Sequence, residues 1–579
     1  MTRIGEKFRP YIEQRRHFLA TRQAEITLAL LGVVAGLLSG GIIIAFRLGI
    51  ENLQQVFLST HDPEGYEALS TAWRFGLPLA GGVLLAVGMW LIHPSSRRVG
   101  VIHVLERLQY HEGHLPLRNL LVQFFGGIIA LASGQSIGRE GPSVHLGAGI
   151  SSLTGQYLSL PNNSIRTLVA CGCAAAIAAS FNTPLAGVVF AMEVIVMEYT
   201  IAGFTPVILA AVMATVMSRA VFGEETAFIV PAVGSATLPD LVYITIMGIA
   251  IGAASAGFVT VIRRLRRTLF DWSPLLVMPM AAVVVGGLGI FVPQVLGTGY
   301  DTVNLAVAGQ LGVMLMIAIL LAKFAASALC VSSRMPGGLI GPAIVMGSLA
   351  GGVYSQLINQ VPGVSSDPSL YAMLGMGAMM SATLQAPMAA LLALLEMTAS
   401  PTLIMPAMLA VVSANLAAKT LFGQRSIYLQ MLQDSGLVYR SDPLSLGLRR
   451  IGVTAAMNRR VVSCESEITL QYAQQLLKEE PQWIVIRQKE DKALLMPGSN
   501  LAAYLENEDL PEKIQLLEVP GQRREIVPVH SQATLYEARR VLDEHKVDAV
   551  YIRRPAGAGS YRILGVLQYQ DIQASYSLR

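Results

Sequence analysis

Five consecutive residues, Gly138-Arg139-Glu140-Gly141-Pro142, combine a carboxylate with the residue types of a helix start. They lie between two apolar stretches, so we expect them at membrane depth, where irregular backbone occurs only if it is buried in protein or lines a cavity. Pro142 suits the first turn of a helix, because the N–H group that it lacks would have no partner there. The segment therefore predicts free N–H groups at a helix N-terminus, which attract an anion.

A second segment, Gly337–Pro342, has the sequence GGLIGP and predicts a second helix start of the same kind. In the first segment, Gly141 permits a close approach of the backbone. Two such helix ends aimed at one point would form an uncharged anion site that needs no buried lysine.

Glu140 is the titratable group of this predicted site. A carboxylate at an anion-attracting helix end competes with the anion for the same N–H groups, so protonation or rotation of the side chain would release the site. Membrane depth favours the neutral form of a carboxyl group, which allows Glu140 to exchange protons near physiological pH. The structural alternative is an ion pair with Arg139.

The chain around these residues is divided into two parts by charge. Ser441–Arg579 carries 36 charged residues in 139, about 26%, whereas the first 440 residues carry 44, about 10%. Soluble proteins are about one quarter charged, so the first part has the composition of a membrane protein and the second that of a soluble domain. This excludes a fully soluble, single-span, disordered or fibrous protein. The net charge of +4 and the absence of a basic stripe argue against nucleic acid as a partner.

Apolar runs of near-membrane length fill the first part. Arginine and lysine residues before the first run, and a second cluster at Arg263–Arg267, predict that both chain ends are cytoplasmic and that the number of crossings is even. The predicted runs are Ile26–Ile50, Trp73–His93, Asn119–Gly134, Thr167–Val196, Phe204–Gly223, Leu241–Ile262, Leu275–Gly297, Gly312–Val331, Leu370–Glu396 and Thr402–Gly423.

The membrane part repeats itself. A shift of 200 residues places Gln123–Gly147 on Lys323–Gly347, and a shift of 203 residues places Pro184 on Pro387. Internal repeats with interrupted helices at matching places indicate a transport site at the interface between the repeats. The C-terminal part also repeats weakly: Val461–Leu505 and Ile526–Tyr576 each read strand, helix, strand, strand, helix, which predicts α/β packing.

Several of these motifs, in this order, resemble the CLC family of chloride channels and transporters. They are GREGP at Gly138, GGLIGP at Gly337, FNTPLAG from Phe181 followed by Glu193, and the tyrosine Tyr428 in SIYL. The resemblance covers roughly residues 25–432. It implies an all-α multi-pass membrane fold, an inverted repeat of tilted and broken helices, and a homodimer in which each subunit has its own pore. It also implies chloride as the transported ion and the lipid bilayer as surroundings.

The resemblance also assigns roles to residues. Glu140 would be the gating glutamate, which blocks the outer anion site and takes up protons. The positions that match the family's anion-binding motifs are Val99, Gly100, Gly138, Arg139, Gly141, Gly338, Leu339, Ile340 and Tyr428.

Two departures from the family pattern bear on function. Val99 stands where the family has a serine that coordinates the anion, which puts selectivity for chloride over nitrate in doubt. Val194, directly after Glu193, stands where proton-coupled exchangers carry an inner glutamate, and a hydrocarbon side chain cannot relay a proton. The sequence therefore favours a passive, voltage- or pH-gated chloride channel, with H+/Cl− exchange and transport of another anion as alternatives. Glu193 and Glu396 match across the repeat and are expected to be structural.

The C-terminal part resembles a tandem pair of CBS domains, a family that often binds adenine nucleotides. Gly565 and Asp571 fit the nucleotide signature, but Gln568 stands at its hydroxyl position, so a purely structural and regulatory domain is the alternative. The predicted organisation is a cytoplasmic segment 1–25, membrane repeats 26–235 and 236–432, a linker 433–450, and a CBS pair 451–579 with copies at about 451–508 and 524–577.

Other classes of function find little support. His111 and His114 could bind a metal but read as solvated loop residues, and His145 reads as a packed histidine of the pore wall. No nucleophile–base set or phosphate loop is present, so we expect no enzyme, no metal and no cofactor. A CBS-regulated cation transporter is a remote alternative, because cation paths need converging carboxylates or carbonyls. The expected location is the plasma (inner) membrane.

Overall fold

The computed structural model describes residues 25–58, 65–198, 201–224, 228, 237–361, 366–439, 443–488, 493–507, 509–557 and 560–577. These residues form two compact units. The helical unit contains the described residues of 29–156 and 166–439. The C-terminal unit contains those from Pro443 onward together with the described residues 25–28 and the connection Tyr157–Ile165. The predicted N-terminal segment 1–25 lies outside the described residues, except for Glu25.

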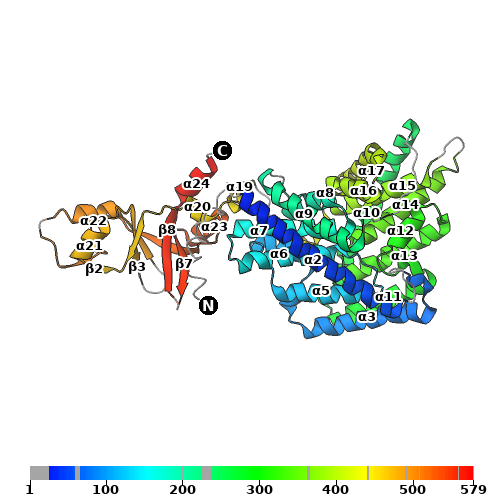
Figure 1. Ribbon diagram of the computed structural model, residues 1–579, viewed down its shortest axis with the longest axis horizontal. Helices are drawn as coiled ribbons and strands as arrows, with labels where there is room; N and C mark the ends of the chain where they lie inside the picture. The colour runs from blue at the N-terminus through cyan, green and yellow to red at the C-terminus, as the bar shows by residue number, and fades with distance from the viewer. Residues whose placement is uncertain are drawn as a thin grey trace. The chain divides into compact units, whose positions relative to one another are not determined.

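The helical unit consists of helices joined by short connections, with α2 the longest of them (Figure 1). Its α-helices are α2 (Glu25–Phe57), α3 (Thr71–Leu91), α4 (Gly100–Tyr110), α5 (Leu117–Ala132), α6 (Glu140–Tyr157), α7 (Asn162–Phe181), α8 (Pro184–Phe190), α9 (Ile201–Phe222), α10 (Leu238–Thr268), α11 (Pro274–Phe291), α12 (Tyr300–Val307), α13 (Val313–Ser332), α14 (Ile340–Ile358), α15 (Pro368–Leu384), α16 (Pro387–Thr398), α17 (Ile404–Leu416) and α18 (Ile427–Asp434). Short 3-10 turns are η1 (Tyr66–Ala68), η2 (Pro94–Arg97), η4 (Pro293–Val295) and η5 (Pro401–Leu403), and π-helical turns are η3 (Ala191–Val196) and η6 (Ala417–Leu421).

The order of helices in the first half of this unit recurs in the second half, so that α2 to α9 correspond to α10 to α17. Corresponding helices also pack on each other: α3 lies beside α11 and α8 beside α16 (Figure 1). The predicted repeat and the predicted all-α membrane fold are therefore confirmed. Eight described helices are long and apolar enough to cross a membrane by length and composition.

Two of the predicted apolar runs are each divided between two helices. Thr167–Val196 is interrupted between α7 and α8, where Asn182 has a φ of 60° before Pro184. Leu370–Glu396 is interrupted in the same way between α15 and α16, where Gln385 has a φ of 55° before Pro387. A left-handed residue ends a helix, and proline two residues later begins the next one. Hydropathy alone did not separate these helices because both members of each pair are apolar.

Glycines that match across the repeat allow two helix crossings at backbone contact. A Cβ atom on Gly147 of α6 would lie 2.2 Å from the Gly172 carbonyl oxygen of α7. A Cβ atom on Gly347 of α14 would lie 2.3 Å from the Gly375 carbonyl oxygen of α15. Small residues at such crossings are the usual device for close helix packing in membranes. Both crossings hold in place the two helices whose starts the sequence predicts to bind an anion.

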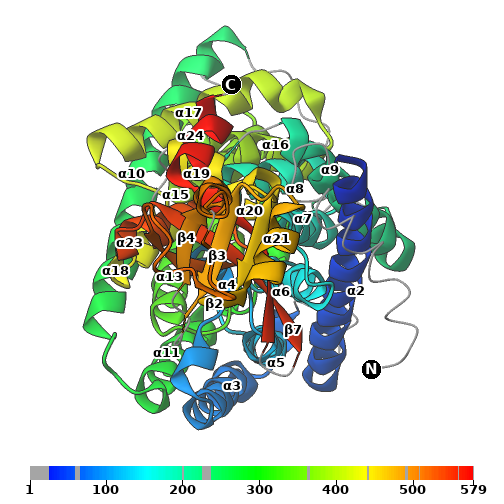
Figure 2. The same cartoon turned by 90° about the vertical axis from the view of Figure 1, so that its left-hand side faces the viewer.

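The C-terminal unit contains a six-stranded sheet in the order β1-β3-β4-β6-β7-β8, of which β3 and β4 are seen side by side in Figure 2. In the first copy β1 is parallel to β3, which is antiparallel to β4, and in the second copy β6, β7 and β8 repeat this arrangement. The predicted repeat of this part is thus present. Its elements are α19 (Pro443–Arg449), α20 (Val453–Ala456), β1 (Val461–Cys464), β2 (Glu467–Thr469), α21 (Leu470–Leu477), β3 (Trp483–Arg487), β4 (Ala493–Pro497), α22 (Gly498–Tyr504), β5 (Lys513–Gln515), β6 (Arg524–His530), α23 (Leu535–His545), β7 (Ala549–Gly557), β8 (Ser560–Gln568) and α24 (Tyr569–Ser577).

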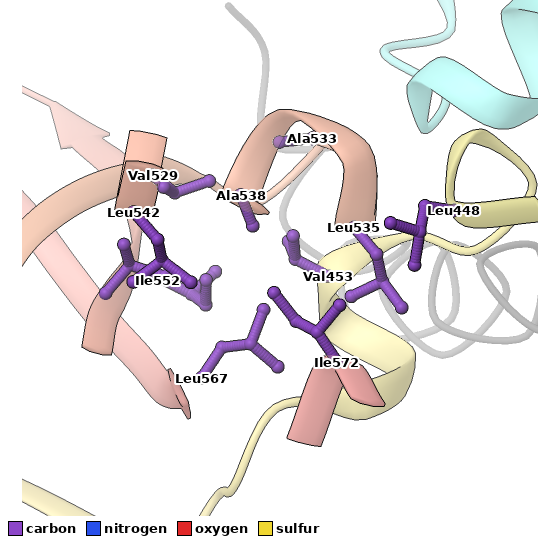
Figure 3. Packing of buried hydrophobic residues seen from close by; sticks show 11 residues of the cluster. Leu448, Val453, Val529, Ala533, Leu535, Ala538, Leu542, Ile552, Leu567 and Ile572 are labelled. Atoms are coloured by element: carbon purple, nitrogen blue, oxygen red, sulfur yellow. The ribbon is translucent and has the colours of Figure 1, made fainter. Parts of the chain in front are cut away.

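The second copy has a core of its own between its sheet and its helices. Leu535 and Leu542 of α23 belong to one buried cluster with Ile552 of β7, Leu567 of β8 and Ile572 of α24 (Figure 3). The strands and helices that the sequence predicts for this copy supply the two faces of this core.

The Gly347 crossing gives a stability prediction. We expect Gly347→Ala to lower the free energy of unfolding by about 1–3 kcal/mol, because the new methyl group meets the Gly375 backbone and the helices must separate. The measurement is thermal unfolding in detergent, followed by the loss of the monodisperse species. The control is Gly257→Ala on α10, where a Cβ atom meets nothing within 4 Å. Equal stability of the two variants would contradict this account of the crossing.

Candidate anion site

The starts of α6 and α14 meet at two glycines that hydrogen-bond each other. The Gly138 N–H donates to the Gly338 carbonyl at 2.8 Å, and the Gly338 N–H donates to the Gly138 carbonyl at 2.7 Å. A Cβ atom on Gly141 would lie 2.7 Å from the Gly338 Cα atom, so the predicted close approach is made to the opposite helix start. Because the first N–H groups of a helix have no acceptor within it, this contact brings two sets of available donors together.

Glu140 is completely buried at this junction. Its carboxylate accepts a hydrogen bond from the Gly341 N–H of α14 at 3.1 Å (Oε2) and another from the Tyr300 hydroxyl (Oε1). A carboxylate from one helix start therefore takes the donor that the other helix start offers. An anion at the start of α14 would compete with Glu140 for this group.

The donors differ in detail from those that the family resemblance implies. The Gly338 N–H is bonded to the Gly138 carbonyl, because each glycine satisfies the backbone of the other. The N–H that meets the carboxylate belongs instead to Gly341, one residue after Ile340. Leu339 is the buried N-cap of α14, and Ile340 is the buried first residue of this helix.

Tyr428 is the second buried hydroxyl near this place. It lies on the first turn of α18, is 4% exposed and interacts electrostatically with Glu140. Its hydroxyl has no hydrogen-bond partner among the described residues. The other end of α18 is fixed, since Arg263 of α10 donates two 2.8 Å hydrogen bonds to Asp434. A buried hydroxyl without a partner costs free energy unless a ligand accepts its hydrogen bond, so Tyr428 fits a bound anion.

The remaining predicted anion-binding positions, Val99 and Gly100, form the start of α4. Val99 precedes the helix and provides no side-chain hydrogen bond to it, and Gly100 has a φ of 78°. α4 packs against α18, which carries Tyr428, and against the π-helical turn η3, which carries Val194. The structure thus brings these predicted positions into one region, in which Val194 is a buried hydrocarbon.

Arg139 makes its contacts with groups other than its neighbour Glu140. Its Nη2 donates to the Ser180 carbonyl at 3.1 Å, and its guanidinium lies over the Tyr300 ring at 5.3 Å. It also lines a cavity with Arg47, Gln54 and other residues of α2. These contacts do not include an ion pair with Glu140, which was the structural alternative for that carboxylate.

Glu193 and Glu396 form matching structural contacts across the repeat. Glu193 accepts hydrogen bonds from the Met388 and Ala389 N–H groups at the start of α16, at 3.4 and 2.8 Å. Glu396 accepts them from the Leu185 and Ala186 N–H groups at the start of α8, at 3.0 and 2.8 Å. Each carboxylate therefore caps the N-terminus of the corresponding helix in the other half.

The other residues that the sequence suggested as metal or nucleotide ligands do not form a second binding site among the described residues. Among the described residues no group of His, Cys, Asp and Glu could hold a metal. His145 instead contacts His103 of α4, with Nε2 and Nδ1 2.9 Å apart. In the C-terminal unit, Gly565 packs on Met457 and Asn458, and Asp571 accepts the Gln568 N–H at 2.8 Å.

Sequence reasoning missed Tyr300, which hydrogen-bonds Glu140. The missed signal is in the repeat: Tyr300 lies 200 residues after Gly100, and α4 and α12 begin at these two residues. A search for identical residues in the two halves passes over this pair, because a tyrosine stands opposite a glycine.

Comparisons with known proteins find a matching family and similar chains. Residues 81–419 match the family described as voltage gated chloride channel. The chain is 32% identical to a ClcB-like chloride channel protein of Ralstonia nicotianae, over 70% of this chain and 95% of the relative. It is 28% identical to the H(+)/Cl(−) exchange transporter ClcA of Vibrio parahaemolyticus, over 61% of this chain and 78% of the relative.

Solved structures show the same fold. A slow cyanobacterial Cl−/H+ antiporter matches with a TM-score of 0.63 and 24% identity, over 70% of this chain and 97% of its own. A eukaryotic CLC transporter matches with a TM-score of 0.59 and 18% identity, over 94% of this chain and 98% of its own. The second match is long enough to include most of the C-terminal unit.

The reciprocal caps give a prediction about Glu396. We expect Glu396→Ala to lower the free energy of unfolding by about 1–3 kcal/mol, because two N–H groups of α8 lose their acceptor. Glu396→Gln, which keeps one acceptor oxygen, should lose less. Thermal unfolding in detergent measures both, and chloride titration of the folded protein should give an affinity like that of the wild type. A chloride affinity that falls with stability intact would show that Glu396 belongs to the anion path.

Proposed function

Since the chain belongs to the voltage-gated chloride channel (CLC) family and is a CLC-type chloride transport protein, we propose that it is a passive chloride channel gated by Glu140. It is an integral multi-pass membrane protein and not an enzyme. The observation that carries the proposal is the position of the Glu140 carboxylate on the Gly341 N–H, at the start of α14. In this state the side chain takes the place of the transported anion.

Protonation is the step that opens the gate in this proposal. A neutral carboxyl group is a weaker acceptor than a carboxylate, so it competes less well with chloride for the Gly341 N–H. Chloride flux should therefore rise as the pH falls. Tyr428 supports the same path, since its buried hydroxyl is available to an anion.

Val194 supports a channel over an exchanger. Exchangers of the family usually carry a glutamate at the inner relay position, and here that position holds the hydrocarbon side chain of Val194. H+/Cl− exchange is the alternative, since the chain also resembles an exchange transporter. Val99 leaves the anion without a serine donor, so nitrate is an alternative substrate.

The finer organisation is part of the proposal. We infer a homodimer in the plasma (inner) membrane, with both chain ends in the cytoplasm. We also infer that the C-terminal unit is a tandem CBS pair, on the basis of its two copies of strand, helix, strand, strand and helix. Because Gly565 and Asp571 are engaged within the unit, we favour a structural and regulatory role for it over binding of an adenine nucleotide.

Replacement of Glu140 tests the gate. We expect Glu140→Gln to conduct chloride at pH 7.5 at least as fast as the wild-type protein does at its acidic optimum, with no remaining dependence on pH, because the neutral amide mimics the protonated acid. The measurement is chloride efflux from liposomes between pH 4.5 and 7.5.

The matched control for this experiment is Glu396→Gln. Glu396 also accepts two backbone hydrogen bonds at a helix start, but it caps α8 outside the proposed path. It should keep the wild-type pH profile. If chloride efflux through Glu140→Gln depends on pH as it does for the wild-type protein, the proposed gate is refuted.

The reversal potential separates channel from exchanger. For a passive chloride channel we expect it to follow the chloride gradient alone, so a proton gradient of two pH units across a planar bilayer should not move it. The control is a chloride gradient at equal pH, which must give the full chloride potential. A shift with the proton gradient would replace the channel by an H+/Cl− exchanger.

A further inference from the structure

We propose that the Tyr300 hydroxyl is a second hydrogen-bond donor of the outer anion site. This hydroxyl holds Glu140 in the blocking position, and it binds the anion once the Glu140 side chain has left. This inference rests on the proposed gating role of Glu140. It concerns a residue that neither the sequence motifs nor the anion-binding positions include.

Two donors from different helices converge on one carboxylate. The Gly341 N–H of α14 donates to Oε2 of Glu140, and the Tyr300 hydroxyl of α12 donates to Oε1. A Cβ atom on Gly341 would lie 3.3 Å from the Tyr300 hydroxyl oxygen, so the two donors are neighbours. When the side chain of Glu140 swings away, both donors face the vacated position. A single halide ion can then accept both hydrogen bonds that the two carboxylate oxygens accepted.

The Tyr300 ring packs against two aromatic rings and one guanidinium group. Phe181 lies 6.1 Å and Phe228 5.6 Å from it, centroid to centroid, the latter edge-on. Arg139 lies over the ring at 5.3 Å. A cation over a phenol withdraws electron density from it and makes the hydroxyl a better donor. The packed ring cannot follow Glu140 when that side chain moves, so the donor stays in the site.

The turn that leads into Tyr300 is also fixed. Lys323 of α13 is completely buried and donates to the Val295 and Gly297 carbonyls at 3.2 and 2.8 Å. The Gly297 N–H donates to the Gly134 carbonyl at 3.0 Å. Gly299, which precedes α12, has a φ of 83°, a conformation that favours glycine. These contacts place the first residue of α12 at the junction of α6 and α14.

The repeat relates Tyr300 to Gly100, because these residues begin corresponding helices. α4 starts at Gly100 and α12 starts at Tyr300, 200 residues later. The start of α4 lacks a side-chain donor because Val99 replaces the family's serine, whereas the start of α12 supplies a hydroxyl. The site thus has a side-chain donor on the side of Glu140.

The surroundings of Glu140 predict the sign of the effect. Its titratable and charged neighbours are Arg139 directly before α6, Tyr300 on α12 and Tyr428 on α18. Of these, the Tyr300 hydroxyl donates directly to the carboxylate. A donor favours the ionised and blocking form, so its removal should let the gate open at higher pH.

Replacement by phenylalanine removes only the hydroxyl. We expect Tyr300→Phe to shift the midpoint of the pH dependence of chloride efflux by about one unit toward alkaline pH, because a hydrogen bond to a charged group changes such an equilibrium roughly tenfold or more. The control is Tyr371→Phe, because Tyr371 is also a buried tyrosine, and its hydroxyl is bonded to Asp240 at 3.2 Å. A midpoint that stays with that of the wild type would overturn the holding role.

A second measurement tests the contact with the anion. In the Glu140→Ala background the carboxylate is gone, and we expect Tyr300→Phe to weaken chloride binding roughly tenfold in calorimetric titration of the purified protein. Tyr371→Phe in the same background should leave the affinity unchanged. An unchanged affinity with Tyr300→Phe would overturn the ligand role.

The two proposals fail in different ways. If Glu140→Gln keeps the wild-type pH profile, the gate itself is refuted, and the role of Tyr300 with it. If Glu140→Gln is independent of pH while Tyr300→Phe has the wild-type midpoint and affinity, only the inference about Tyr300 is refuted.

Discussion

The two hydrogen bonds between Gly138 and Gly338 are the constraint on which the rest of the site depends. At membrane depth a helix can begin only if the irregular backbone before it is satisfied within the protein. Each glycine satisfies the other, and neither has a side chain that would keep the two chains apart. The residues after them are then free to present unpaired N–H groups to an ion. Without this pair, each helix start would need its own buried polar partner, which would occupy the space where the anion binds.

The same economy explains why an anion path is poor in basic residues. Helix starts supply positive potential through neutral backbone N–H groups. An anion bound there therefore needs no buried Lys or Arg, whose charge would be costly to keep within the membrane. Lys323, which is completely buried, donates hydrogen bonds to the carbonyls of Val295 and Gly297 instead. The carboxylates of Glu193 and Glu396 likewise serve the scaffold, because each caps a helix of the opposite half. That leaves Glu140 as the carboxylate that meets the helix start where an anion would bind.

The sequence predicted the features that depend on local chemistry. The glycine and proline residues of Gly138–Pro142 and Gly337–Pro342 indicate the local backbone conformation by their residue types alone. The 200-residue shift identified the repeat. It did not predict the breaks at Asn182 and Gln385, because these residues adopt a left-handed conformation within continuous apolar runs. Nor did it predict Tyr300, whose contact with Glu140 depends on the turn that Lys323 and Gly134 hold in place. Contacts between residues 160 positions apart follow from the packing of whole helices.

The symmetric scaffold carries an asymmetric site, and the asymmetry comes from two pairs of residues. With the 200-residue shift, Glu140 corresponds to Ile340, and Tyr300 corresponds to Gly100. In each pair one half supplies a polar side chain and the other half supplies none. The polar members come from opposite halves, yet they bond to each other, because the helix starts of the two halves meet around the glycine pair. A two-fold arrangement of backbone donors would bind an anion equally from either side. The acid and the phenol lie on one side alone, and in the proposed function this asymmetry provides the gate of an otherwise symmetric anion site.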